Sequence, residues 1–448
     1  MTWETEGLLT NLTILTVCGS LGLGIGSIAG GSLAASLGGI RRTMLISNVV
    51  AIISCCLKLI EWFPALVAGR LLFGICCGAQ QFCMSKALND TVPVKKIQLF
   101  SQFINGGLGI GVFISNLLGF LIPILDEEDP QSRADLIADE NWRIVYGFSI
   151  VCEVFALIII PLAFPSLSLS SLVQSGEKEQ AKTLVKRVYK LAHLGAEEED
   201  KAAEEIVNIL GSTTSGSSSD LTLGEALTSK QHRFTSWNAV IMTFINQFSG
   251  ISAILFFQTN IFLHMKDTGE FTLLPVIWSV QCVNFINMVA SFFSHIPSGI
   301  FGQRVNLITG THAVYICLAG IVVFNMMDLS IGILICLLCH LTCYQLSLGA
   351  IVLAHVQETC ADRAVGFATL LFFLWVVITS LLIAPMIDNM GSSFTFGFFA
   401  VWTFLGSIYL HFNLKDTTYK YVVVEEAGEK VQKRVPCTEK DKKQLYMT

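Results

Sequence analysis

The stretch INQFSGISAILFF, residues 245–257, places amide and hydroxyl side chains inside an apolar region. Asn246, Gln247 and Ser252 can each donate and accept hydrogen bonds without the cost of placing a charge in a membrane. Gly250 stands four residues after Asn246, on the same helical face, where the absence of a side chain allows the backbone to bend or a ligand to approach. Two interpretations follow: these groups bind a ligand, or they hold two helices together.

Ionisable side chains also lie in or near apolar segments. Glu153 stands in the middle of IVCEVFALIII, and Lys86 precedes Asp90 by one helical turn. An ionisable residue inside a membrane is a functional candidate by default. Glu153 is therefore a candidate for proton coupling, and Lys86 with Asp90 is a candidate i, i+4 pair.

Catalytic chemistry is not indicated. Cys336, Cys339, His340 and Cys343 share one face of a single predicted helix. Successive turns are about 5.4 Å apart, which spreads four ligands too far to surround one metal ion. The sequence contains no recognisable nucleophile–base pair and no phosphate loop. We therefore expect no enzyme activity, no metal site and no cofactor.

The elements that carry these residues are predicted membrane helices. The 448-residue chain is 53% hydrophobic and 14% charged, with a mean hydropathy of +0.63, which is too apolar for ordinary soluble domains. A bilayer core requires about 20 apolar residues per helix. Eleven stretches meet that length: 10–36, 43–62, 64–88, 98–125, 142–164, 233–262, 272–296, 305–326, 329–356, 364–386 and 392–412. We expect an all-α polytopic membrane protein embedded in a lipid bilayer, in the plasma membrane or an endomembrane.

The distribution of basic residues predicts the orientation. Of the 28 Lys and Arg residues, 22 fall in loops and tails that alternation of the spans places on one side. The positive-inside bias makes that side cytoplasmic. The net charge of −6 comes mostly from a few loops and gives no reason to expect a nucleic-acid partner.

The chain divides into two membrane halves that echo each other. We predict an N-terminal half at 1–164, a cytoplasmic helical linker at 165–232, a C-terminal half at 233–414 and a cytoplasmic tail at 415–448. Arg42 and Arg304 each open an R-x-x-L-I sequence, and Asp90 and Glu358 each open an acid-Thr-x3-base sequence. Two matches at nearly the same offset argue for an internal duplication. Five spans precede the linker and six follow it, so we expect twelve helices in the complete fold and a first helix absent from this sequence.

These features resemble the sugar porters of the major facilitator superfamily, which include the facilitative glucose transporters. The GR-x3-G-x3-G signature of that family is matched by GRLLFGICCG, with Gly69, Arg70, Gly74 and Gly78. Its Q-Q-x-S-G-x-N-A motif in the seventh helix is matched by INQFSGISA. The resemblance covers the chain from the second helix of the family onward.

The resemblance implies a set of substrate-binding and gating positions. Amide, hydroxyl and indole groups at the binding positions would hydrogen-bond a sugar, and charged residues at the cytoplasmic ends would form ion pairs that gate the site. The substrate-binding positions are Asn246, Gln247, Ser252, Asn284, Asn105 and Trp375. The gating and ion-pair positions are Arg42, Asp90, Arg304, Glu358, Arg363 and Arg70.

The chain departs from the family in its tenth helix. The stretch SLGAIVL, residues 347–353, replaces a proline-rich run that ends in Trp, and Leu353 stands at the Trp position. Because every N–H of a proline-free segment can bond internally, we expect this helix to be stiffer than in the family.

The leading interpretation is a carrier that moves a hexose or a related neutral sugar or polyol by alternating access. Transport would proceed by facilitated diffusion or by proton symport. The alternative is a sugar-binding sensor without transport, or a degenerate transporter-like protein. The oligomeric state and the choice of sugar are left open by the sequence.

Overall fold

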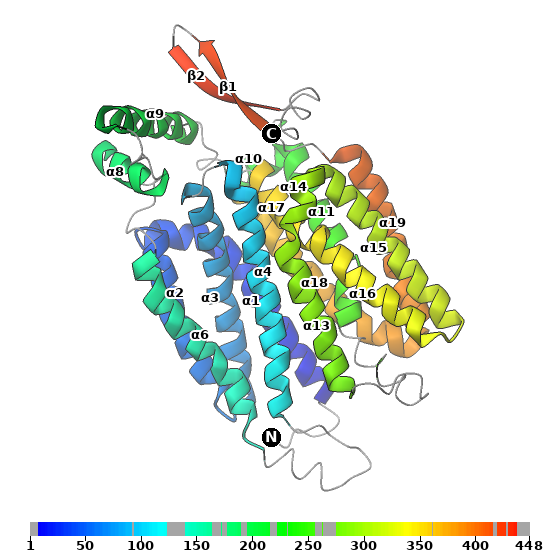
Figure 1. The fold of residues 1–448 in the computed structure, drawn as a ribbon. Coiled ribbons are helices and arrows are strands. Elements are labelled where there is room, and N and C mark those ends of the chain that lie inside the picture. The colour runs from blue at the N-terminus through cyan, green and yellow to red at the C-terminus, as the bar shows by residue number, and fades with distance from the viewer. Residues whose placement is uncertain are drawn as a thin grey trace.

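Apolar helices packed side by side make up most of the computed structural model (Figure 1). The structure describes residues 8–91, 94–122, 139–163, 172, 177–189, 195–215, 222–230, 232–255, 262, 275–360, 362–414, 419–426 and 429–436. Ten helices in this part of the chain are long and apolar enough to cross a membrane. A further helix outside these ten, α13 (Val276–Phe293), lies in the same bundle. Each of the eleven predicted stretches thus contains a helix, and the predicted all-α membrane fold is confirmed.

The first half contains five long helices. They are α1 (Leu8–Ser36), α2 (Ile40–Lys58), α3 (Phe63–Thr91), α4 (Val94–Leu118), which continues into the 3-10 turn η2 (Gly119–Leu121), and α6 (Trp142–Ala163). Helices α1 and α3 approach closely because glycines face each other. A Cβ on Gly26 would lie 2.1 Å from the Ile75 carbonyl oxygen, and one on Gly78 would lie 2.2 Å from that of Leu23. Two glycines of the GR-x3-G-x3-G motif, Gly74 and Gly78, therefore act as contact points between membrane helices.

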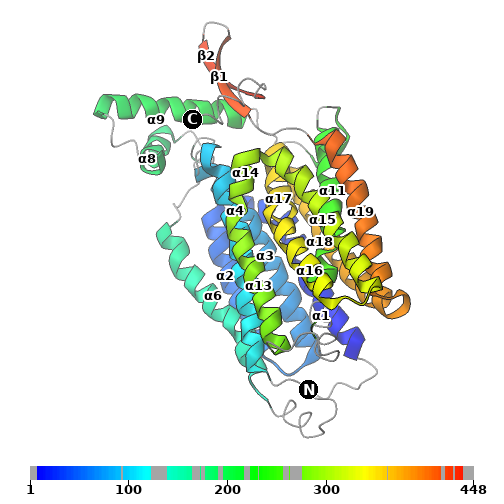
Figure 2. The same cartoon turned by 45° about the vertical axis from the view of Figure 1, so that its right-hand side comes forward.

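The second half holds the largest apolar core. Its helices are α11 (Arg233–Gln247), α13, α14 (His295–Phe301), α15 (Gln303–Met326), α16 (Ser330–Leu346), α17 (Leu348–Thr359), α18 (Asp362–Met390) and α19 (Ser392–Asn413). Leu307, Leu318 and Phe399 are fully buried in this core. Helix α15 runs beside α16 and α19, which places these side chains between the three helices (Figure 2).

The segment predicted to be a stiff tenth helix is interrupted, although it contains no proline. Helix α16 ends at Leu346 and α17 begins at Leu348, with Ser347 (φ −130°, ψ −88°) between them. The break needs no proline because side chains from other helices bond the carbonyl groups beside it. Asn306 Nδ2 donates to the Leu346 oxygen at 2.8 Å, and Asn246 Nδ2 donates to the Leu348 oxygen at 2.8 Å.

The two halves share a structural signature at the start of α2 and α15. Gly39 (φ 122°) precedes α2 and Gly302 (φ 81°) precedes α15, and both have the left-handed backbone that glycine tolerates. An arginine stands two residues after each glycine. Arg41 donates to the Pro161 oxygen near the end of α6 at 3.1 Å, and Arg304 donates to the His411 oxygen near the end of α19 at 3.2 Å. The structural counterpart of Arg304 is therefore Arg41, which corrects the predicted match with Arg42 by one residue.

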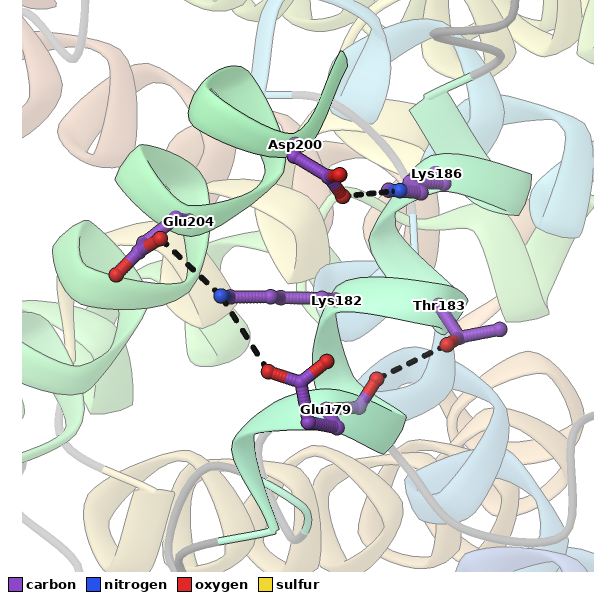
Figure 3. Close-up of polar contacts among 6 residues, drawn as sticks. All are labelled: Glu179, Lys182, Thr183, Lys186, Asp200 and Glu204. Carbon is purple, nitrogen blue, oxygen red and sulfur yellow. Dashed lines mark hydrogen bonds and ion pairs between the residues drawn. The ribbon is translucent and has the colours of Figure 1, made fainter. Parts of the chain in front are cut away.

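The segment that connects the two halves in the sequence contains two helices, which form a separate pair at one end of the bundle (Figure 1). They are α8 (Lys178–Tyr189) and α9 (Ala196–Ser215), and the short α10 (Leu223–Thr228) follows. Buried Ala181 and Val185 of α8 meet Ala203 and Val207 of α9. Figure 3 shows the polar rim of this seam, where Lys182 bonds Glu179 and Glu204, and Lys186 bonds Asp200.

A small β-hairpin follows the last membrane helix. Strands β1 (Tyr419–Glu426) and β2 (Glu429–Pro436) pair antiparallel, with Tyr419 opposite Pro436 and Glu426 opposite Glu429. The hairpin lies at the same end of the bundle as α8 and α9 (Figure 2). It was not foreseen in the sequence, where 415–448 was predicted only as a tail.

Candidate functional site

The INQFSG stretch forms a break in a membrane helix. Helix α11 ends at Gln247, and helical structure resumes at Ile251. Gly250 has φ +80°, and a Cβ there would lie 3.2 Å from both Leu318 Cδ2 and Phe399 Cβ. Glycine is required by both the backbone conformation and the space. The predicted bend is therefore present.

Side chains from neighbouring helices bond the carbonyl groups freed by this break. His340 Nε2 lies 2.9 Å from the Ser249 oxygen, and Thr403 Oγ1 donates to the Phe248 oxygen at 3.2 Å. His340 and Thr403 are both fully buried. The histidine that resembled part of a metal cluster thus acts as a support for the broken helix.

Asn246 is occupied by the protein itself. Besides its bond to the Leu348 oxygen, its Oδ1 accepts from the Tyr344 hydroxyl at 2.9 Å and from Gln247 Nε2 at 3.3 Å. The side chain therefore links the break in α11 to the break between α16 and α17. The helix-linking interpretation describes Asn246 better than the ligand-binding one. Ser252 is half-buried, and its side-chain hydroxyl has no hydrogen-bond partner among the described residues.

Helix α13 presents a ladder of buried amides at three-residue spacing. Gln281, Asn284 and Asn287 are 6%, 1% and 4% exposed, and residues three apart share one helical face. Asn287 Oδ1 accepts from Gln345 Nε2 at 3.0 Å, and Gln345 Oε1 accepts from Asn105 Nδ2 at 3.3 Å. This chain of amides joins α4 in the first half to α13 and α16 in the second.

Two helices, α13 and α18, carry buried polar atoms that have no protein partner in the described structure. Asn284 Nδ2 donates to the Val280 oxygen at 3.0 Å, but Asn284 Oδ1 is buried with no partner in the described structure. The same holds for Trp375 Nε1 on α18, whose ring lies edge-on to Phe244 at 5.3 Å. Buried polar atoms are nearly always paired, so each such exception requires an explanation. A ligand that carries hydroxyl groups is one explanation, because a hydroxyl both donates and accepts.

Comparison with known proteins gives the family. Residues 3–425 match the family described as "Sugar (and other) transporter". The chain belongs to this family. Hexose transporter 1 of Toxoplasma gondii is 22% identical over 319 residues, which cover 69% of this chain and 53% of that protein. Facilitated glucose transporter member 3 of Canis lupus familiaris is 26% identical over 294 residues, 64% of this chain and 54% of that protein. The chain thus spans about half the length of the curated relatives it matches.

Solved structures establish the fold. The proton:xylose symporter XylE bound to 6-bromo-6-deoxy-D-glucose aligns with a TM-score of 0.75 and 15% identity, over 93% of this chain and 88% of that one. The transporter FucP in its outward conformation aligns with a TM-score of 0.59 and 11% identity. This member of the sugar-transporter family therefore has the major facilitator fold and is an integral multi-pass membrane protein. Its relatives are transporters rather than enzymes.

The predicted gating residues of this transporter-family chain are only partly within the described structure. The side chains of Asp90 and Glu358 fall outside it, so the predicted pairs with these acids, including Lys86 with Asp90, lie there too. Arg42 and Arg363 are exposed and form no ion pair with a described carboxylate. Arg304 donates to the His411 carbonyl, and no carboxylate within the described part of the chain forms an ion pair with it.

Arg70 ties together three helices of the first half. Its guanidinium donates to the Leu15 oxygen at 3.0 Å and to the Tyr146 hydroxyl at 3.1 Å. It also lies 5.5 Å from the Tyr146 ring centroid. Arg70 thus joins α1, α3 and α6 through neutral acceptors.

A hydrogen bond between the halves was missed in the sequence. Gln357 Nε2 of α17 donates to Ser85 Oγ of α3 at 3.0 Å. Gln357 directly precedes Glu358, so the repeated acid-Thr motif was the available signal for this location. A neutral bond between α3 and α17 is present where the resemblance implied ion pairs.

Glu153 has a polar environment that the sequence did not reveal. It is 8% exposed, and Gln80 Nε2 donates to it at 3.4 Å and to Asn48 Oδ1 at 2.6 Å. Lys58, at the end of α2, is 5% exposed, lies within electrostatic range of Glu153 and has its Nζ 3.9 Å from the Phe73 ring centroid. The signal that was overlooked is a lysine inside the predicted span 43–62. A buried carboxylate and a buried ammonium therefore share the interior of the first half.

Proposed function

We propose that this chain is a membrane carrier for a hexose or a related neutral sugar or polyol. The observation that carries the proposal is the pair of buried, unpaired atoms Asn284 Oδ1 and Trp375 Nε1. One is an acceptor and the other a donor, and both stand at positions that the resemblance to the family assigns to the substrate. A neutral hydroxylated molecule supplies both partners without bringing a charge into the membrane.

Asn246 has a different part in this proposal. Its amide is already committed to Leu348, Tyr344 and Gln247. It holds the two helix breaks in place, while Gln247, Asn284 and Trp375 contact the substrate. Broken helices near the bilayer midplane are a common location for substrate sites in transporters.

Alternating access requires contacts between the halves that can break and re-form. The bonds Asn105–Gln345 and Ser85–Gln357 cross between the halves and involve no charged group. Each such neutral bond contributes about 1 kcal/mol, which is small enough for the halves to separate at one end while they pack at the other. Helix pairs α1–α18 and α4–α13 form the most extensive packed contacts between the halves, and α4 also contacts α17 and α14.

Equilibrium binding tests the site. Removing the amide in Asn284→Ala should weaken the binding of D-glucose, or of whichever hexose binds the wild type, by about 1–3 kcal/mol. Asn116→Ala is the matched control, because Asn116 also bonds a carbonyl in its own helix, Val112 at 2.9 Å, but is exposed. Unchanged affinity in both Asn284→Ala and Trp375→Phe would exclude this site.

Proton symport is the finer alternative to facilitated diffusion, and Glu153 is its candidate. The carboxylate is buried in the first half and contacts Gln80. The ionisable groups around it include Lys58 and the thiols of Cys55, Cys76, Cys77 and Cys152. A carboxylate that exchanges a proton as the halves move would couple sugar flux to the pH gradient.

A further inference from the structure

Gln281 differs from the other buried amides of the described bundle in its hydrogen bonding. The residue is only 6% exposed, and neither Nε2 nor Oε1 of its side chain has a partner in the described structure. Every other described side-chain amide with an unpaired buried atom, namely Asn48, Asn238 and Asn284, bonds through its second polar atom. Gln281 was not among the positions derived from the sequence.

A structural role does not account for this glutamine. An amide that links helices must bond something, as Asn287, six residues further along α13, bonds Gln345. A buried amide without partners costs free energy that a leucine at the same position would avoid. Gln281 makes no such bond, so helix linking is excluded for it within the described structure.

The position of Gln281 relative to Asn284 points to a ligand. The two residues are three apart on α13, which puts them on one helical face and about 4.5 Å apart along the axis. Together they offer two unpaired acceptors, Gln281 Oε1 and Asn284 Oδ1, and one unpaired donor, Gln281 Nε2. These groups match the hydroxyls of one molecule of sugar size. Because α13 begins at the end of the bundle opposite α8 and α9 (Figure 1), Gln281 lies toward that end from Asn284.

We infer that Gln281 contacts the substrate and determines specificity, by bonding a hydroxyl group at the end of the sugar that points away from the α8–α9 pair. The inference rests on the proposed function and extends the site by one turn of α13. It assigns to this chain a recognition group for one particular hydroxyl, separate from the one at Asn284.

A series of monodeoxy sugars tests this assignment. Binding of D-glucose and its monodeoxy analogues is measured in detergent for the full chain, for Gln281→Leu and for Gln281→Met, which keeps nearly the same volume. Both variants should weaken D-glucose binding on the order of 10-fold. For one analogue, which lacks the contacted hydroxyl, wild type and variants should bind equally.

Thermal unfolding separates contact from structure. Because the amide bonds no protein group, both variants should unfold in the absence of sugar at the same temperature as the wild type or higher, and they should lose most of the rise caused by sugar. An equal loss for every analogue, no loss for any, or a lower unfolding temperature without sugar would overturn the assignment. If the wild type binds no sugar, the proposed function fails as well, whereas sugar binding that both variants retain refutes only the role of Gln281.

Discussion

At the residue scale, the buried amides differ in whether the protein satisfies them. Asn246 has three bonds to other residues, whereas Asn284 Oδ1 and both polar atoms of Gln281 have none in the described structure. The sequence predicted the amide-rich segment correctly, because polar residues in an apolar stretch are conspicuous. It could not predict that the protein itself bonds the Asn246 side chain. The partners, the Tyr344 hydroxyl and the Leu348 carbonyl, come from α16 and α17, about 100 residues away in the chain.

Replacing Asn246 tests this division. Asn246→Ala leaves the Leu348 carbonyl and the Tyr344 hydroxyl without their partner, so we expect a loss of about 2–3 kcal/mol in stability. The unfolding temperature in detergent should fall, while the sugar affinity of the folded fraction changes little. For Asn284→Ala we expect the reverse: the sugar affinity should fall while the unfolding temperature changes little. Weakened binding by Asn246→Ala at an unchanged unfolding temperature would return Asn246 to the substrate site.

Glu153 carries the second residue-scale prediction. If proton symport operates, Glu153→Gln removes the group that exchanges the proton, and uptake into proteoliposomes should lose its dependence on an imposed pH gradient. Gln80→Leu is a companion variant, because it removes the hydrogen bond to the carboxylate and keeps the carboxylate itself. Wild-type uptake that ignores the gradient would leave facilitated diffusion as the mechanism.

At the element scale, two helix breaks shape the second half. The break at Gly250 was predictable, because glycine between polar residues is a known signal. The break at Ser347 was not, because it depends on Asn306 and Asn246, which reach it from other helices. The helices themselves followed from hydrophobic length, but the β-hairpin at 419–436 did not.

Gly250→Ala measures the value of the first break. The substitution forces a side chain into the left-handed region and against Leu318 and Phe399, so we expect destabilisation of at least about 1–2 kcal/mol. Gly299→Ala is the control, since Gly299 lies in helix α14 with nothing within 4 Å of its Cβ position. The control should be neutral or stabilising by up to about 1 kcal/mol. Equal unfolding temperatures for both variants would show that the break is not required.

The α8–α9 pair gives a prediction about pH. The Lys186 ammonium bonds the Asp200 carboxylate (Figure 3) and holds the pKa of Asp200 below its usual value. A lowered folded-state pKa means that this contribution is present above the unfolded-state pKa and is lost as the pH falls through the folded-state one. Spin labels on α8 and α9 should therefore report a broader distance distribution at acid pH. Asp200→Asn should already be broad at neutral pH and change less on acidification; an identical response in both would contradict the assignment.

At the scale of the whole molecule, the two halves repeat one design. Arg41 and Arg304 each bond a carbonyl near the end of the last helix of their half, where the helix dipole favours a positive charge. Sequence repetition indicated the duplication but placed the match one residue away, because two arginines stand side by side at 41–42. The hydrogen bond between Ser85 and Gln357 could not be predicted from the sequence, because it depends on how the two halves pack together.

That contact makes a testable prediction about the balance between states. Gln357→Ala removes one bond that joins α3 to α17, which should favour separation of these helices by about 1 kcal/mol, or roughly a fivefold change in population. Distances between spin labels at the neighbouring ends of α3 and α17 measure the change. Ser85→Ala should have the same effect, and the double variant should add little. Full additivity of the two changes would show that the bond does not couple them.

Counterflow of labelled D-glucose in proteoliposomes is the most direct test of the central claim, that this chain carries a neutral sugar through the site on α13. Wild type and Asn116→Ala should accumulate label transiently when loaded with unlabelled hexose, and Asn284→Ala should require a much higher sugar concentration for half-maximal rate. No counterflow from folded wild-type protein, with any hexose or polyol tried, would contradict the carrier function. Binding without counterflow would identify a sugar sensor instead.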